Sequence, residues 1–222
     1  MPYFFAQRDG GRALIAGSDA RHLALSLRAR VGEEIEVVDP AGFMLTVRLE
    51  EVSPARVEGV IVSERAYQPE PVARITVAIA NLPASSLELV LSRCTEAGAF
   101  AFHVFQADRS VARGAKPERW KTICREAAML AGRLRVPDVS GPSSFEDVLA
   151  VGHPVMLVRD APERLAGLKA HRDLTLLVGP EGGWSDRERS VAGVVKASLG
   201  PRNLRADTAA LVGLATAMAR RE

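Results

Sequence analysis

Two short turns near the C-terminus carry the residue types best suited to chemistry. The first, GPEGGWSDRE at residues 179–188, follows an apolar run and sets Glu181 among three glycines. The second, LGPRNLRADTA at residues 199–209, has a similar layout and leads into a segment rich in Ala and Leu. Glycines allow a ligand to approach the main chain closely, and proline stiffens a turn. Together the two turns predict a ligand site built largely from backbone groups.

The first turn does not match the common nucleotide-binding loops. It lacks the Gly-Lys-Ser/Thr ending of a phosphate loop and the G-x-G-x-x-G dinucleotide pattern. A carboxylate at Glu181 would repel polyphosphate oxygens, whereas a ligand with hydrogen-bonding edges and positive character, such as an adenosyl sulfonium, suits the turn. A purely structural turn is the alternative, because Ser185 and Glu188 form an S-x-x-E capping box that would fix the next helix.

Alternating strands and helices are expected to position these turns. Beyond residue 72, apolar segments of strand length alternate with segments of helical period. The helix that begins at Pro117 should turn one apolar side inward, formed by Trp120, Ile123, Ala127 and Leu130. The expected strands are 74–80, 101–105, 154–160 and 173–179, and the expected helices are 86–98 and 117–130. This order predicts an α/β fold with a mostly parallel sheet covered on both faces. Ligands of such sheets bind at the carboxyl ends of the strands, where the first turn falls.

The first third of the chain has a different period. Residues 34–63 consist of short, alternating, β-branched segments broken by the turn DPAG, which predicts an antiparallel meander. Ser18 is expected to cap a short helix that carries Leu23 and Leu27 on one face. The proline-rich segment YQPEPVA at 67–73 is the expected linker. We therefore expect a small β-rich domain at 1–68 and an α/β domain at 72–222.

Composition indicates an ordinary soluble globular protein, with 47% hydrophobic and 25% charged residues. The sequence has no apolar stretch near the roughly 20 residues of a membrane span, and its N-terminus lacks the layout of a secretory signal. We therefore expect a cytoplasmic protein without membrane contact. Cys94 and Cys124 form no C-x-x-C pair, and the four histidines are scattered. Two reduced, buried thiols and no metal site are expected.

Charge is unevenly distributed along the chain, although its net value is only +2. Residues 1–32 hold five arginines against two acids, whereas residues 33–64 hold two arginines against eight acids. A second basic stretch, residues 93–135, has nine Lys or Arg against four acids. The two basic regions are consistent with contacts to a nucleic-acid backbone, and a solvated helix face would explain each one alone.

The two C-terminal turns together resemble a family signature. GPEGGWSDRE followed by LGPRNLRADTA is similar to the pattern of the RsmE type of ribosomal small-subunit RNA (uracil-N3)-methyltransferases, which belong to the SPOUT class and use S-adenosylmethionine. HLALSLRARVGEEIEVVD resembles the start of that family's small PUA-like β-barrel, and RCTEAG and ERWKTICREAAMLAGRLRVPDV fall where its central helices lie. The resemblance covers the whole chain. It implies an N-terminal PUA-like β-barrel that binds RNA, a C-terminal SPOUT-type trefoil-knotted α/β domain, and a homodimer with the active site at the subunit interface.

The same resemblance implies an activity and its partners. These are S-adenosylmethionine-dependent methylation of N3 of a uridine in 16S ribosomal RNA, with the RNA or the small ribosomal subunit as substrate and no metal. A diverged SPOUT methyltransferase with another RNA target is one alternative. A non-catalytic RNA-binding module is the other, although it would not need both C-terminal turns.

Roles for individual residues follow from the resemblance and from the chemistry. Methylation at uracil N3 requires removal of its proton or stabilisation of the resulting anion. We expect Arg205 to stabilise that charge, Asp207 to accept the proton and Thr208 to orient Asp207. A plain N-cap of the last helix is the alternative for Asp207. The adenosyl group would be held by Leu177, Gly179, Pro180, Glu181, Gly182, Gly183, Leu199, Gly200 and Leu204. RNA would be contacted by Arg28, Arg30, Arg109, Arg113, Arg133 and Arg202.

Four positions depart from the family pattern. Asp207 replaces a longer acid, Asn203 stands where an aliphatic residue is usual, Leu130 replaces a glutamine, and the customary lysine before Leu87 is missing. These differences lie near the expected RNA entrance and leave the cofactor turn intact. Trp184, directly after that turn, would either stack on a base or pack the loop onto the core, and the second is favoured.

Overall fold

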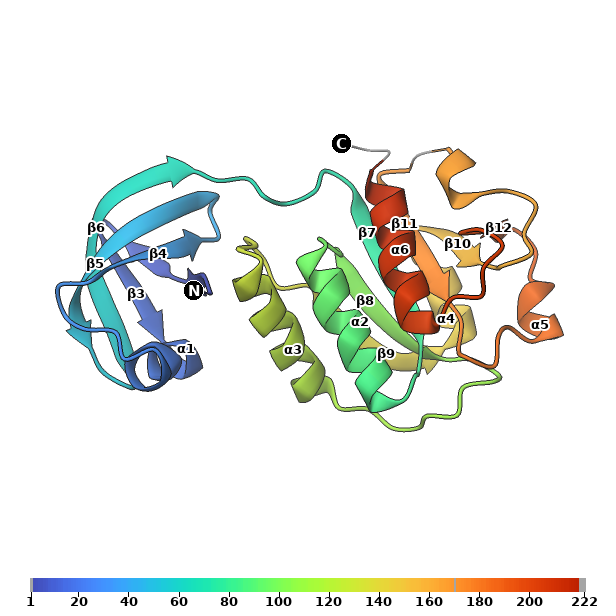
Figure 1. The fold of residues 1–222 in the computed structure, drawn as a ribbon, viewed down its shortest axis with the longest axis horizontal. Helices are drawn as coiled ribbons and strands as arrows, with labels where there is room; N and C mark the ends of the chain where they lie inside the picture. The colour runs from blue at the N-terminus through green and yellow to red at the C-terminus, as the bar shows by residue number, and fades with distance from the viewer. Residues whose placement is uncertain (1, 170, 220–222) are drawn as a thin grey trace. The chain divides into compact units, whose positions relative to one another are not determined.

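The computed structural model describes residues 2–169 and 171–219 and divides the chain into two compact units (Figure 1). The first consists of Met1–Glu70 with Ala128–Arg135, and the second of Pro71–Ala127 with Val136–Glu222. Residues 128–135 therefore group with the first unit, whereas the sequence pattern kept them inside the segment 72–222. Among the helices that the structure describes, none combines the length and the apolar character needed to cross a bilayer.

Within its described residues, the first unit forms a curled six-stranded sheet with the order β1-β4-β5-β6-β3-β2 (Figure 1). Its strands are β1 (Phe4–Phe5), β2 (Gln7–Asp9), β3 (Arg12–Ala16), β4 (Glu34–Asp39), β5 (Phe43–Val52) and β6 (Arg56–Ala66). The last three pair antiparallel in chain order, which confirms the meander expected over 34–63. The turn between β4 and β5 closes where the Gly42 amide donates to the Asp39 carbonyl at 2.9 Å.

A helical segment precedes β4, but Ser18 does not cap it. α1 (Gly17–Arg21) begins after Ala16, whose side chain makes no capping hydrogen bond, and continues directly into the π-helical turn η1 (His22–Ser26). The expectation for Ser18 was wrong because the helix starts at Gly17, which places Ser18 inside the first turn. The shared apolar face is confirmed: Leu23 is fully buried, and Leu27 packs against the same core.

Residues 128–135 are fixed to the first unit by apolar burial and by an ion pair. Met129 belongs to the unit's core, and its carbonyl accepts from the Tyr3 amide at 2.9 Å. The side chain of Arg133 is 5% exposed and lies 2.6 Å from the Glu70 carboxylate. Breaking such a pair would leave a buried charge uncompensated, so the pair holds this segment in place.

Over its described residues, the second unit contains a six-stranded, fully parallel sheet with the order β12-β10-β11-β7-β8-β9. Its strands are β7 (Arg74–Ala80), β8 (Ala101–Gln106), β9 (Asp138–Ser144), β10 (His153–Leu157), β11 (Asp173–Val178) and β12 (Val195–Ala197). The central strands β7 and β11 are buried at every position after their first residue, so both faces of the sheet are covered. The predicted parallel α/β sheet is confirmed.

The helices of the second unit form largely where the periodicity predicts them (Figure 1). They are α2 (Ala84–Glu96), α3 (Pro117–Leu130), α4 (Phe145–Leu149), α5 (Asp186–Arg189) and α6 (Ala206–Met218), with a 3₁₀ turn η2 (Leu165–Gly167). Ala127 is buried together with Trp120 and Ile123, as expected. Leu130 is instead 60% exposed, because Ala128 and Met129 take the buried side in the last turn of α3. α6 packs against α2, β7 and β11, and the side chains of Cys94 and Cys124 are buried and form no disulfide.

Candidate functional site

A cavity of about 680 Å³ lies at the carboxyl edge of the parallel sheet in the second unit. Its walls come mainly from residues 157–160 after β10, residues 178–184 after β11 and residues 199–206 before α6. The volume lies within the range of small-molecule sites, about 300–1,000 Å³. Eight of the nine residues expected to hold a cofactor line the cavity: Gly179, Pro180, Glu181, Gly182, Gly183, Leu199, Gly200 and Leu204. Leu177, the ninth, is buried within β11.

Trp184 fastens the glycine turn, residues 179–183, to the core of the second unit. It is 8% exposed, its Nε1 donates to the Leu157 carbonyl at 2.9 Å, and its ring stacks on Phe105 with the centroids 6.0 Å apart. A Cβ added to Gly179 would lie 2.8 Å from this indole, so the turn needs glycine there. The buried indole confirms the interpretation of Trp184 as a packing wedge.

The helix after the turn is capped as the sequence predicts. Ser185 Oγ accepts from the Glu188 amide at 3.2 Å, and Glu188 Oε2 accepts from the Ser185 amide at 2.8 Å. Glu188 is fully buried, and its Oε1 also accepts from the Asp108 amide at 3.0 Å. The capping box therefore ties the glycine turn to the loop that follows β8.

Ser198 shapes the second turn of the cavity. Its hydroxyl donates to the Arg159 carbonyl at 2.9 Å and accepts from the Gly200 amide at 3.0 Å. Gly200 has a φ of +127°, in a region that residues with a Cβ rarely adopt. One hydroxyl thus connects the wall after β10 with the wall before α6.

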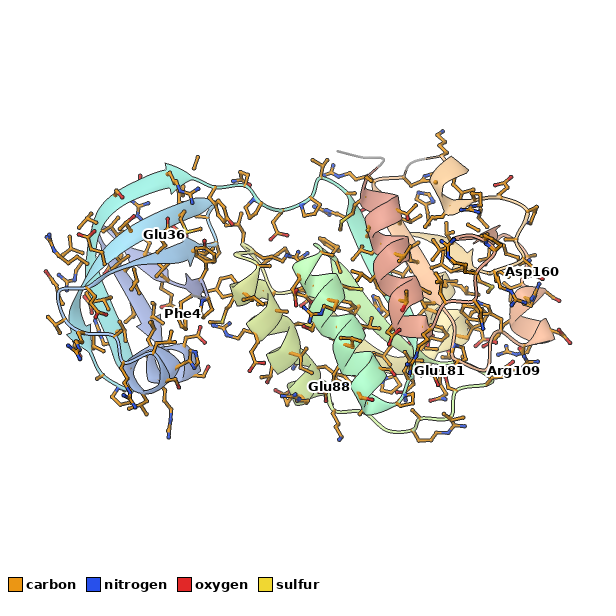
Figure 2. The ribbon with its side chains drawn as sticks, viewed as in Figure 1. Phe4, Glu36, Glu88, Arg109, Asp160 and Glu181 are labelled. Atoms are coloured by element: carbon orange, nitrogen blue, oxygen red, sulfur yellow. The ribbon has the colours of Figure 1, made fainter. Side chains whose placement is uncertain are left out.

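The cavity wall carries both signs of charge. Arg189 lies 2.9 Å from Asp160, and this hydrogen bond holds the pKa of Asp160 below its ordinary value. The other charged residues of the lining are Arg159, Glu181, Arg202 and Arg205. Figure 2 shows Asp160 and Glu181 at the same end of the second unit, although they follow different strands. Among the charged side chains that line the cavity, arginines outnumber carboxylates, so the cavity suits an anionic group as well as a cationic centre.

Arg205, not Asp207, is the N-cap residue of α6. The N-cap alternative for Asp207 was wrong because the helix begins at Ala206, which puts Asp207 in its first turn. Asp207 Oδ1 accepts from the Thr208 amide at 2.6 Å and from Thr208 Oγ1 at 3.1 Å. Arg205 lines the cavity, whereas the described lining does not include Asp207 or Thr208.

Three of the six arginines expected to contact RNA lie in the second unit. Arg202 lines the cavity. Arg109 donates from Nη1 to the Gly182 carbonyl at 3.1 Å, so it contacts the glycine turn itself. Arg113 is exposed and donates to the carbonyls of Ser110 and Ala112 within its own loop.

The other three arginines lie in the first unit. Arg28 and Arg30 are exposed, and Arg28 has an unusual φ of +55°. Arg133 is buried against Glu70, so its guanidinium has little surface to offer a phosphate. Arg28 and Arg30 therefore fit an RNA-facing position better than Arg133 does.

Sequence reasoning missed one wall of the cavity and a cluster beside it. The wall at 157–160 could have been predicted from the rule that ligands bind at the carboxyl ends of strands. The cluster is centred on Asp108, which accepts from Arg187 Nη2 at 2.7 Å and from Arg187 Nε at 3.0 Å. Hydrogen bonds from Arg187 and Ser185 lower the pKa of Asp108 to about 2. Within the described residues, no three His, Cys, Asp or Glu side chains form a group suited to a metal ion.

Comparison with known proteins gives relatives that cover most of the chain. Residues 68–218 match the family described as RNA methyltransferase domain. Ribosomal RNA small subunit methyltransferase E of Mycobacterium bovis is 33% identical over 225 residues, covering 92% of this chain and 85% of that protein. The protein of the same name from Synechocystis sp. is 35% identical, covering 87% of this chain and 68% of that protein. The crystal structure of a ribosomal RNA small subunit methyltransferase E from Neisseria gonorrhoeae bound to S-adenosyl methionine has a TM-score of 0.86 at 27% identity, covering 97% of this chain and 95% of that one.

Proposed function

This chain belongs to the RNA methyltransferase family, and we propose that it methylates N3 of a uridine in 16S ribosomal RNA with S-adenosylmethionine as the methyl donor. Its relatives at 33% and 35% identity are named ribosomal RNA small subunit methyltransferase E, which supports ribosomal RNA as the substrate. The observation that carries the proposal is the cavity lined by both C-terminal turns. We expect the protein to act in the cytoplasm, on 16S ribosomal RNA or the small ribosomal subunit.

The cavity fits S-adenosylmethionine in size and in chemistry. Its volume of about 680 Å³ is that of a small-molecule site. The glycine turn brings main-chain N–H and C=O groups to the wall, where they can bond the edges of an adenosine. Glu181, which also lines the cavity, would attract the positive charge of the sulfonium. Bound S-adenosylmethionine supplies an electrophilic methyl group.

Residues at the start of α6 would handle the charge and the proton of the uracil. Arg205 lines the cavity, where its guanidinium would stabilise the negative charge that develops on the uracil oxygens as N3 loses its proton. The N-terminus of α6 adds a partial positive charge. Asp207 would accept the proton, and the hydrogen bonds from Thr208 hold its carboxylate.

RNA contacts are proposed for exposed arginines of both units. Arg202 beside the cavity, Arg113 after β8, and Arg28 and Arg30 in the first unit present cations to phosphates. The first unit would act as a PUA-like RNA-binding barrel and the second as the SPOUT domain. Asn203 is exposed in the cavity wall at a position where the family pattern has an aliphatic residue, so a diverged enzyme with another RNA target is the second candidate.

We further propose that α6 is threaded through a trefoil knot and that two copies of the chain form the active enzyme. The α6 sequence ADTAALVGLATAM is apolar on nearly every side. A helix of this kind is normally covered all round, yet Val212 is 39% exposed, and Leu89 of the neighbouring α2 is 44% exposed. A second copy placed over α2 and α6 would bury both. Light scattering should give the mass of a dimer for the wild type and a smaller mass for Val212→Lys; a monomeric wild type would argue against this assembly.

Calorimetric titration with S-adenosylmethionine tests the cofactor site. Gly182→Val should weaken binding at least tenfold, because a Cβ at Gly182 already approaches Arg109 within 3.3 Å beside the cavity. Gly167→Val is the matched control, since nothing lies within 4 Å of a Cβ at Gly167 and the residue does not line the cavity. If folded wild-type protein did not bind S-adenosylmethionine, either with or without RNA, the assignment of a cofactor site to this cavity would be contradicted.

Activity is tested on unmodified small ribosomal subunits and on naked 16S ribosomal RNA. After incubation with S-adenosylmethionine, the RNA is digested and its nucleosides are identified by mass spectrometry. We expect N3-methyluridine. Another methylated nucleoside would support the diverged enzyme, and RNA binding without methyl transfer would support the non-catalytic module.

A further inference from the structure

The loop between β8 and α3 contacts the glycine turn of the cavity directly. Arg109, in this loop, donates from Nη1 to the Gly182 carbonyl at 3.1 Å. A charge-assisted hydrogen bond of this kind is stronger than one between neutral groups. The bond fixes the orientation of the Gly182 peptide, and Gly182 is part of the cavity wall. Figure 2 labels Arg109 and also Glu181, the residue before Gly182, in the second unit.

The residue before Arg109 locks the loop onto the helix that follows the glycine turn. The Asp108 carboxylate accepts from Ser185 Oγ at 2.5 Å and from two nitrogens of Arg187 at 2.7 and 3.0 Å. The Asp108 amide donates to the buried Glu188 carboxylate at 3.0 Å. Main chain and side chain of one residue are thus both held by α5 and its cap, so the loop cannot shift without breaking several bonds.

Arg109 and Arg113 lie in the same loop but have different surroundings. Arg113 is exposed and donates to the Ser110 carbonyl at 2.6 Å and the Ala112 carbonyl at 3.1 Å, both in its own loop. Arg109 instead reaches a residue 73 positions further along the chain. The sequence presents Arg109 and Arg113 as equivalent phosphate contacts. In the structure, only Arg109 of the two contacts the glycine turn.

We propose that Arg109 is a positioning residue for the methyl donor: it holds the Gly182 peptide of the cavity wall, and Asp108 anchors it by fixing the loop to α5. The inference rests on the proposed function, because it assigns S-adenosylmethionine to this cavity. Arg109 acts through the wall of the site, so its effect on the methyl donor does not require RNA. Arg113 makes hydrogen bonds within its own loop, so it would act on RNA and not on the methyl-donor site.

The test measures S-adenosylmethionine affinity by calorimetry in the absence of RNA. Arg109→Ala should weaken binding about tenfold, whereas Arg113→Ala should leave it within twofold of the wild type. In steady-state assays Arg109→Ala should raise KM for S-adenosylmethionine, and Arg113→Ala should raise KM for the RNA. Equal affinities for Arg109→Ala and wild type would overturn the proposal, and so would an equal loss in Arg113→Ala, which would indicate a general effect of positive charge.

A second pair of variants tests the anchor. Asp108→Asn removes the charge that pairs with Arg187 and should weaken S-adenosylmethionine binding about threefold to fivefold. Glu146→Gln is the matched control, because Glu146 also pairs with Arg187 but does not belong to the loop. Equal losses in both variants would show that Arg187, rather than the loop, carries the effect, and would overturn the role of Asp108.

Folding and the proposed function are tested separately. Far-ultraviolet circular dichroism should show an unchanged fold for Arg109→Ala, because the side chain is exposed. Arg109→Lys keeps the charge but not the planar fork of donors and should recover only part of the affinity; full recovery would contradict the hydrogen-bond argument. A wild-type protein that does not bind S-adenosylmethionine would overturn the proposed function, whereas wild-type binding with unchanged binding in Arg109→Ala would overturn this inference alone.

Discussion

Substitution of Glu188 should destabilise the second unit more than substitution of any exposed acid. Its side chain is fully buried and accepts from the Asp108 amide at 3.0 Å and from the Ser185 amide at 2.8 Å. Glu188→Ala would leave both donors without this acceptor. Each unsatisfied buried donor costs about 1–3 kcal/mol. Because Asp108 is exposed and Ser185 is half-buried, we take the lower half of that range for each donor and expect a loss of about 2–4 kcal/mol.

Urea unfolding followed by tryptophan fluorescence measures this loss, since Trp184 lies directly before the capped helix. Glu188→Gln keeps one oxygen acceptor and should cost roughly half as much as Glu188→Ala. Glu118→Ala is the control, because Glu118 is an exposed acid in the first turn of α3. It should have little effect. If Glu188→Ala cost no more than Glu118→Ala, the two amides would not depend on this carboxylate and the argument would be refuted.

Three further predictions concern catalysis, thiol reactivity and acid stability. Arg205→Ala should lower kcat by about a hundredfold or more, as loss of a group that stabilises an anion does, and Asp207→Asn should lower it less; methyl-transfer assays decide the order. Burial raises the pKa of the Cys94 thiol to about 12, so Cys94 should not react with a thiol reagent at pH 8 until urea unfolds the protein, and native labelling would contradict this. Asp108 has a pKa of about 2 in the fold against an ordinary 3.8, so its stabilising contribution is complete above pH 4 and is lost as the pH falls toward 2. In acid unfolding, the stability difference between wild type and Asp108→Asn should therefore be full above that window, shrink within it and disappear below it.

Much of the fold was predictable because its signals are local. β7 and β11 are continuous apolar runs in the sequence and are buried on both sides in the sheet. The capping box joins Ser185 and Glu188, which are three positions apart, and it forms as predicted. The two turns that line the cavity could be recognised in the same way, because glycine and proline mark a turn wherever the chain later folds.

The rest depends on contacts between distant segments. Asp108 and Arg187 are 79 residues apart, and neither position suggests the other in a single sequence. Leu130 keeps the helical period of α3, yet the last turn of the helix buries Met129 instead. Ser18 has the right type for an N-cap, but the helix starts one residue before it. For Asp108 and Met129, the segment packed against the residue, and not the local pattern, decides which side chain makes the contact.

The geometry at the start of α6 indicates which of Arg205 and Asp207 should contribute more to the proposed reaction. Arg205 is the last residue before the helix, with an extended backbone, and its side chain lines the cavity. Asp207 lies two residues further on, inside the first turn, and both hydrogen bonds that it accepts from Thr208 fall on Oδ1. Oδ2 is therefore the oxygen that would take a proton. Because the cavity lining includes Arg205 but not Asp207, Arg205 would be available to stabilise negative charge as soon as a uracil entered the cavity. Proton transfer to Asp207 requires the base to approach the start of the helix, so Arg205 should account for the larger share of the rate.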